Sequence, residues 1–261
     1  MFPHHVESIR RTTAHFSRQA GVKGLLLGGS LAHGFGAVHS DVDVMILVSD
    51  QEYAQRAKTG RIHFYSRELC TYPGGYVDGK YLSRSFLDQV RTRGTEPARY
   101  AFQGARVLFS RDPALPRLVR EIVRYPVAEK AGRIRRFCAQ FEAWFWYTGE
   151  ARKRRNAYLL STAVSKLVLF SGRMILAHNE MLYPYHKWFL RVLAAAPEKP
   201  AGLPALIREI LLHPTRRNLE HYARIVRKFR AWDPGPPSWP VQFIADSEQH
   251  WLSGPPPIDD L

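Results

Sequence analysis

The fold is decided by the stretch LLLGGSLAHG (residues 25–34) and by SDVDVMILV (residues 40–48), which follows it after a short loop. Each stretch holds an apolar run of strand length, and two glycines and a serine break the first run, which predicts a turn into a short helix. Because strand side chains alternate between two faces, we expect Asp41 and Asp43 to point one way while Val42 and Val44 enter the core. The sequence therefore predicts two neighbouring carboxylates beside a glycine-rich turn.

Two carboxylates on one face repel each other unless a cation lies between them. Mg²⁺ is the usual ion for such a pair, because it takes oxygen ligands and shares its coordination shell with substrate phosphates. The turn at Gly28, Gly29 and Ser30 offers backbone N–H groups and a hydroxyl to an anion at the start of a helix. An Asp-x-Asp pair alone is usually a solvated strand end, and Gly-Gly-Ser alone is usually a turn. Their combination indicates a metal and phosphate site.

The order of these features resembles the DNA-polymerase-β-like nucleotidyltransferase superfamily. The pattern is Gly-Ser after an apolar run, a glycine a few residues later, and Ser-Asp-x-Asp heading an apolar strand. More narrowly, it is similar to the small bacterial branch that contains antibiotic nucleotidyltransferases, and it covers residues 24–48. The resemblance implies that Gly29 and Ser30 bind the phosphates of a nucleoside triphosphate, and that Asp41 and Asp43 ligate Mg²⁺. Two magnesium ions are expected on the same ground.

One position departs from the pattern, because His33 stands where members of the superfamily commonly carry arginine. The superfamily also implies a third acidic residue on a neighbouring strand, which completes the metal site or removes the acceptor's proton. Asp78 is the favoured candidate, at a separation from Asp43 that suits one intervening hairpin. Lys80 would share the face of Asp78 and reach a phosphate. The competing candidate, Glu96, is interpreted instead as the start of a helix, where an acid suits the helix dipole.

The resemblance continues more weakly into the second half, where residues 179–188 (NEMLYPYHKW) resemble a segment of the same branch. Related enzymes use lysines of this region to contact the nucleotide's phosphates, and Lys166 and Lys187 are the candidates. Lys166 lies in an otherwise apolar helical stretch, where burying an unpaired ammonium is costly. We therefore expect it to face an interdomain cleft.

The apolar pattern changes near Tyr125-Pro126, from short runs separated by turns to helical spacing. It predicts the α+β class, with a nucleotidyltransferase catalytic domain of small mixed sheet at 1–125 and an all-helical domain at 126–261 that closes the cleft. The His4-His5 pair is expected at a mobile end. The expected strands are 22–27, 41–48, 62–66, 75–83 and 105–109, and the expected helices are 4–19, 84–93, 114–124, several within 127–193, then 203–212 and 219–232.

The chain of 261 residues carries a net charge of +15, spread along both halves and rich in arginine. Such a field attracts nucleotides, pyrophosphate or nucleic acid and disfavours a polycationic acceptor such as an aminoglycoside. No apolar run of about 20 residues stands out as a membrane span. The two cysteines, Cys70 and Cys138, form no cluster with ligand spacing, so a reduced, cytoplasmic setting is expected, without a disulfide or zinc framework.

These observations together predict a Mg²⁺-dependent nucleotidyltransferase that moves a nucleoside monophosphate onto a hydroxyl of a small molecule and releases pyrophosphate. AMP from ATP is the expected donor reaction, and antibiotic modification or biosynthesis is the expected context. One alternative is transfer to RNA or protein, which the charge favours but no RNA-binding module accompanies. Another is a catalytically silent, antitoxin-like binding protein of the same fold. The oligomeric state stays open.

Overall fold

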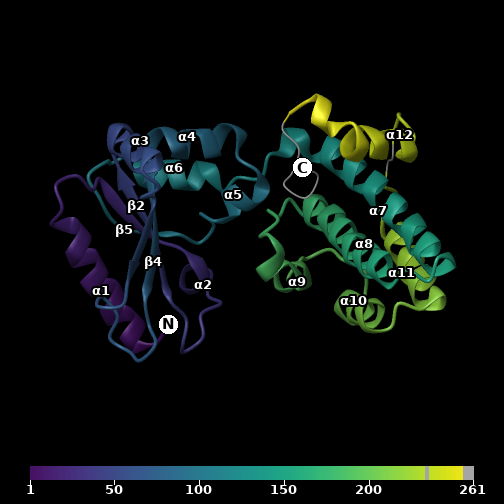
Figure 1. Cartoon of the computed structure of the whole chain (residues 1–261), viewed down its shortest axis with the longest axis horizontal. Coiled ribbons are helices and arrows are strands. Elements are labelled where there is room, and N and C mark those ends of the chain that lie inside the picture. The colour runs from purple at the N-terminus through teal and green to yellow at the C-terminus, as the bar shows by residue number, and fades with distance from the viewer. Residues whose placement is uncertain (233–234, 255–261) are drawn as a thin grey trace. The chain divides into compact units, whose positions relative to one another are not determined.

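The computed structural model describes residues 1–232 and 235–254. The chain divides into two compact units, Met1–Arg124 and Tyr125–Leu261, next to the expected boundary at Tyr125-Pro126. The first holds the only sheet in the described residues and the second is helical, which confirms the α+β class (Figure 1). Two features of the sequence lie partly outside the described residues. These are Pro234-Gly235-Pro236-Pro237, which predicts a break in the helical pattern, and the proline-rich stretch from Ser253, which predicts a loose tail.

The N-terminal unit is built on a five-stranded mixed sheet with the strand order β3-β4-β2-β1-β5. β2 runs antiparallel to β1 and parallel to β4, while β1 pairs antiparallel with β5 and β3 with β4. The elements, in chain order, are α1 (Pro3–Ser17), β1 (Gly24–Leu27), α2 (Gly29–Ala32), β2 (Val42–Val48), α3 (Asp50–Lys58), β3 (His63–Ser66), β4 (Val77–Ser83), α4 (Arg84–Arg93), α5 (Glu96–Tyr100), β5 (Arg106–Ser110) and α6 (Leu115–Ile122).

Helices cover both faces of this sheet, so its central strands are buried on both sides. Alternate residues of β2 separate cleanly: Val42, Val44 and Ile46 join Phe16 of α1 in one core. The intervening residues of β2 pack with β1 and with α4 and α6 in the other, which holds Met45, Leu47, Leu87, Leu118 and Ile122 among others. Asp43 is the one residue of β2 that is only partly buried. It occupies a core-facing position at the start of the strand.

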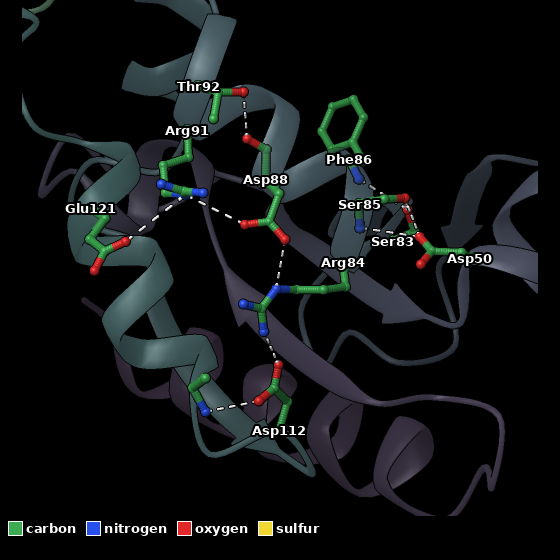
Figure 2. A network of polar contacts seen from close by, with 11 residues as sticks. Asp50, Ser83, Arg84, Ser85, Phe86, Asp88, Arg91, Thr92, Asp112 and Glu121 are labelled. Carbon is green, nitrogen blue, oxygen red and sulfur yellow. Dashed lines mark hydrogen bonds and ion pairs between the residues drawn. The ribbon is translucent and has the colours of Figure 1, made fainter.

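A polar network fixes the helices on the second face of the sheet (Figure 2). Arg84 donates to Asp88 in its own helix (3.1 Å) and to Asp112 in the loop before α6 (2.6 Å). Asp50, the first residue of α3, accepts hydrogen bonds from the backbone N–H and the hydroxyl of Ser85. The pairs are partly exposed, so each contributes at most about 1 kcal/mol. They link the starts of α3 and α4 to the loop that leads into α6.

The expectation of a single hairpin between Asp43 and Asp78 is wrong, because α3 also lies between β2 and β4. α3 has no buried residue, so it carries no apolar stripe for a pattern to detect. Its local signals are polar. The Ser49 hydroxyl accepts from the Glu52 N–H at 3.2 Å, and Glu52 pairs with Arg56 at 2.7 Å, which together cap and reinforce the helix. The helix allows β2 and β4 to run parallel.

The helical unit is dominated by the packing of two long helices, α7 and α8. Its elements are η1 (Val127–Glu129), α7 (Lys130–Lys153), α8 (Ala157–His178), α9 (His186–Ala194), α10 (Leu203–Leu212), α11 (Arg216–Phe229), α12 (Trp239–Phe243), a π-helical turn η2 (Ile244–Glu248) and η3 (His250–Leu252). α8 is long and apolar enough to cross a membrane, contrary to the expectation from the sequence, although half of its most apolar window is buried within the unit. A core helix has the same properties.

Candidate functional site

The three candidate carboxylates meet at one edge of the sheet. Asp43 and Asp78 lie directly opposite each other in the parallel pair of β2 and β4, and Asp41 directly precedes β2. One carboxylate oxygen of each residue lies within 4.8 Å of the oxygens of the other two. All three side chains are only partly buried. Three oxygen donors converging from two strands form a group that suits a hard divalent cation.

The pKa of Tyr76 reflects the negative charge of these three carboxylates. The negative charge of Asp41 and a hydrogen bond to it raise the pKa of Tyr76 above its usual value, and Asp78 and Asp43 add to the effect. A phenol beside concentrated negative charge resists ionisation, since a second anion there would be repelled. The site is therefore a region of negative potential within a strongly basic chain, and it favours a cation.

The glycine-rich turn packs against the carboxylate of Asp43. The Gly28 N–H donates to the Asp43 carbonyl at 2.9 Å, which holds the end of β1 beside the start of β2. Gly29 has a φ of +59°, and a Cβ built on it would lie 1.7 Å from Asp43 Oδ2. Only glycine fits there, because it tolerates the left-handed conformation and leaves room for the carboxylate. The turn and the acidic pair thus form one structural unit.

Ser30 is buried, and its Oγ has no hydrogen-bond partner within the described part of the chain. A buried hydroxyl without a partner is costly, so this atom suits a ligand oxygen. The helix that starts here, α2, is a single turn of four residues and aligns few peptide dipoles. What the turn can offer to an anion is the Ser30 hydroxyl and the first N–H groups of α2, which have no acceptor within the helix.

The lysine candidates are distributed between the two units. Lys80 is exposed on β4, on the face of Asp78 and two residues beyond it. Lys166 is half-buried in α8, where it lines a cavity of the helical unit. Lys187 is exposed at the start of α9, with its ammonium 5.1 Å from the centre of the Trp188 ring. Glu96 is the first residue of α5, as expected, and is buried away from solvent.

His63 is a site residue that sequence reasoning missed. It lies on β3, and its Nε2 is 2.9 Å from Asp78 Oδ1. The β3–β4 pairing sets His63 opposite Lys80, which brings it diagonally within reach of Asp78. Residues 67–76 separate the two strands, and so long a connection leaves their register undetermined by any turn rule. The sequence showed a histidine within an expected strand, but it did not indicate that this histidine would contact Asp78.

The expectation of a mobile His4-His5 pair is also wrong. His5 is fully buried, and its Nε2–H donates to the Ser40 carbonyl at 3.0 Å, while the Tyr72 hydroxyl donates to the same carbonyl at 2.5 Å. His4 Nε2 lies 2.9 Å from the Val38 carbonyl. The start of α1 therefore holds the loop that presents Asp41.

The titration of His5 makes the packing of α1 against the loop before Asp41 sensitive to pH. Burial and the neighbouring His4 lower the pKa of His5, and its Nδ1 has no hydrogen-bond partner among the described residues. The unfolded chain therefore takes up a proton more readily than the folded chain. We expect the free energy of unfolding to fall as the pH drops from about 6.5 towards the lowered pKa, with a slope below about 1.4 kcal/mol per pH unit.

The substitution His5→Gln keeps a side-chain N–H donor and removes the titration. Urea unfolding between pH 8 and pH 5 should show a shallower pH dependence than in the wild-type chain, with similar stability at pH 8. An unchanged slope would contradict a role for His5.

No family model matches the chain, and no curated protein matches it. Among solved structures, it is similar to a nucleotidyltransferase-like protein from Exiguobacterium sibiricum 255-15. The two chains share 11% sequence identity with a TM-score of 0.49, over 95% of this chain and 79% of that chain.

Proposed function

We propose that this protein is a Mg²⁺-dependent nucleotidyltransferase that transfers a nucleoside monophosphate, AMP from ATP, to a hydroxyl of a small-molecule acceptor. The observation that carries the proposal is the convergence of Asp41, Asp43 and Asp78 within 4.8 Å, beside a glycine–serine turn that closes on Asp43. The acceptor is neutral or anionic, because the chain's +15 charge disfavours a polycation. A setting in the reduced cytoplasm suits the free Cys70 and Cys138.

The residues present fit the metal that this reaction uses. The donors are all carboxylate oxygens, which Mg²⁺ prefers, and the raised pKa of Tyr76 marks the negative charge that a cation would balance. Asp41, Asp43 and Asp78 would hold the ion. When bound, magnesium neutralises charge on the triphosphate and favours ionisation of a hydroxyl.

In the proposed reaction, an oxygen of the acceptor forms a bond to the α-phosphorus while the bond from that phosphorus to the β-phosphate oxygen breaks, and pyrophosphate leaves. Asp78 is the candidate to take the acceptor's proton, and His63 fixes one of its oxygens at 2.9 Å. Ser30 Oγ and the turn's N–H groups would orient the phosphates, with Gly28 holding the turn against β2. Catalysis of this kind is mainly positioning and charge stabilisation. Lys80, which shares the face of Asp78, is the proposed cationic contact to the phosphates.

The position at which ATP is cleaved tests this proposal directly. ATP carrying a labelled α-phosphate is incubated with the protein, Mg²⁺ and pooled small hydroxyl compounds, with EDTA as the control. We expect label to appear in an AMP adduct, or in AMP when water is the acceptor, together with pyrophosphate. Formation of ADP and phosphate instead would place the chemistry at the γ-phosphate and contradict nucleotidyl transfer.

A further inference from the structure

The helical unit contains an open cavity of about 530 Å³ that is lined by residues of this unit. α7 lines it from one face, with Arg133, Arg136, Gln140 and Trp144 at helical spacing, and α8 contributes Lys166, Phe170 and Arg173 at intervals of four and three residues. The remaining wall comes from Asp246, Ser247 and His250 at η2 and η3. The volume is in the range of small-molecule sites. Long charged side chains occupy positions where two packed helices usually present apolar ones.

Positive charge exceeds negative charge around this cavity. Four cationic side chains line it, against two carboxylates. Arg133 pairs with Glu129 at 2.7 Å, and Arg136 pairs with Asp246 at 2.8 Å, which accounts for both acids. Lys166 makes no hydrogen bond or ion pair with any described residue, although it is half-buried. An ammonium held partly out of water without a counter-charge favours the arrival of an anion.

Arg173 adds positive charge to the aromatic part of the cavity wall. Its guanidinium lies 4.3 Å from the centre of the Phe137 ring and 4.4 Å from that of Tyr183. Stacking on both rings fixes the cation in place. The Phe137 and Phe170 rings lie 6.3 Å apart.

The opposite wall is also ordered, by hydrogen bonds. The Trp144 indole N–H donates to Gln140 at 3.0 Å, and Gln140 donates to Ser247 at 2.7 Å. These bonds use the polar atoms of Trp144 and Gln140. The Trp144 ring also packs near Tyr147 (5.2 Å) and Phe243 (6.4 Å) and lines the cavity. A wall whose side chains are already held loses little entropy on binding a ligand. The cavity therefore combines flat apolar surfaces with an unbalanced cation.

We propose that this cavity is a binding site for a small organic anion with a planar apolar body, held by the ammonium of Lys166 and the rings of Phe137, Phe170 and Trp144, and that the anion binds independently of the nucleotide. All its lining residues belong to the helical unit, whereas the three carboxylates belong to the N-terminal unit. The proposal does not depend on nucleotidyl transfer, since binding here is measured without turnover.

Three probes of the same shape and different charge test it: naphthoate, naphthylmethanol and naphthylmethylammonium. Their binding to the full-length chain is measured by isothermal titration calorimetry. We expect naphthoate to bind about tenfold more tightly than the alcohol, and the ammonium compound to bind most weakly, because a charge-assisted contact supplies roughly 1.5 kcal/mol or more. Equal affinity of the three probes, or no binding of naphthoate, would overturn the proposal.

Two substitutions of Lys166 locate the site. Lys166→Met removes the charge and keeps the chain length, and Lys166→Gln is a second variant in case the first fails to fold. Either should weaken naphthoate binding about tenfold and leave the alcohol unaffected. Lys228→Met, at an exposed lysine of α11, is the matched control and should leave all three affinities unchanged. Unaltered naphthoate binding in folded Lys166 variants would contradict the assignment.

Nucleotide competition distinguishes this site from the triphosphate site to which the family resemblance assigns Lys166. Naphthoate should bind equally well to wild type and to Asp43→Asn, with or without saturating Mg²⁺ and a non-hydrolysable ATP analogue. Displacement of naphthoate by the nucleotide would show that Lys166 serves the nucleotide, and the separate site would be rejected. Failure of nucleotide binding alone would contradict the proposed function and leave this site intact.

Discussion

Replacing Gly29 with alanine should eliminate Mg²⁺-dependent nucleotide binding. The new Cβ would lie 1.7 Å from Asp43 Oδ2, so either the carboxylate or the turn must move. The positive φ adds about 1–2 kcal/mol of backbone strain for any residue with a Cβ. Because the displaced carboxylate is a proposed metal ligand, we expect affinity for a non-hydrolysable ATP analogue with Mg²⁺ to fall by about a hundredfold or more.

Gly34→Ala is the matched control for this prediction. Gly34 also has a positive φ, of +74°, but a Cβ there would meet nothing within 4 Å. The positive φ should cost each variant about 1–2 kcal/mol of unfolding free energy in urea. Gly29→Ala should lose more because of the clash with Asp43, and only Gly29→Ala should lose nucleotide binding. If the two variants bind nucleotide equally well, the close packing of the turn against Asp43 has no role in the site.

Replacing Asp78 with asparagine should reduce turnover by about 10² to 10⁴, measured as Mg²⁺-dependent pyrophosphate release from ATP. Asparagine keeps the shape of the side chain and removes the charge that would take a proton or hold a metal. His63→Gln, which keeps a donor toward Asp78 Oδ1, should have a smaller effect than His63→Ala. Turnover at the wild-type rate in Asp78→Asn would remove Asp78 from the proposed mechanism.

The sequence was sufficient for those parts of the fold that local pattern determines. The apolar run of β2 and the break at Gly28-Gly29-Ser30 predicted the strand and the turn. Asp41 lies one residue before the strand, and Asp43 is its second residue. α4 and α10 begin and end where their apolar spacing predicts. These elements carry an apolar face, a cap or a glycine that marks their ends.

Features that depend on pairing between distant segments could not be predicted in the same way. The contact of His63 with Asp78 requires the β3–β4 register, which ten connecting residues do not specify. The burial of His5 depends on α1 packing against the loop that ends at Ser40. The cavity around Lys166 joins α7 and α8 to a segment some 70 residues farther along the chain. α3 is different, because the sequence carries its Ser49–Glu52 capping signal but no apolar stripe.

We propose that Asp41, Asp43 and Asp78 hold a divalent cation together with a nucleoside triphosphate. Calorimetric titration of a non-hydrolysable ATP analogue, with and without Mg²⁺, tests it on wild type, on Asp43→Asn and on Asp88→Asn. The last makes the same chemical change in the same unit, at a residue that pairs with Arg84 outside the cluster. We predict Mg²⁺-dependent binding by wild type and Asp88→Asn, and a loss of that dependence in Asp43→Asn. Binding that ignores Mg²⁺, or that Asp43→Asn retains in full, would contradict the claim.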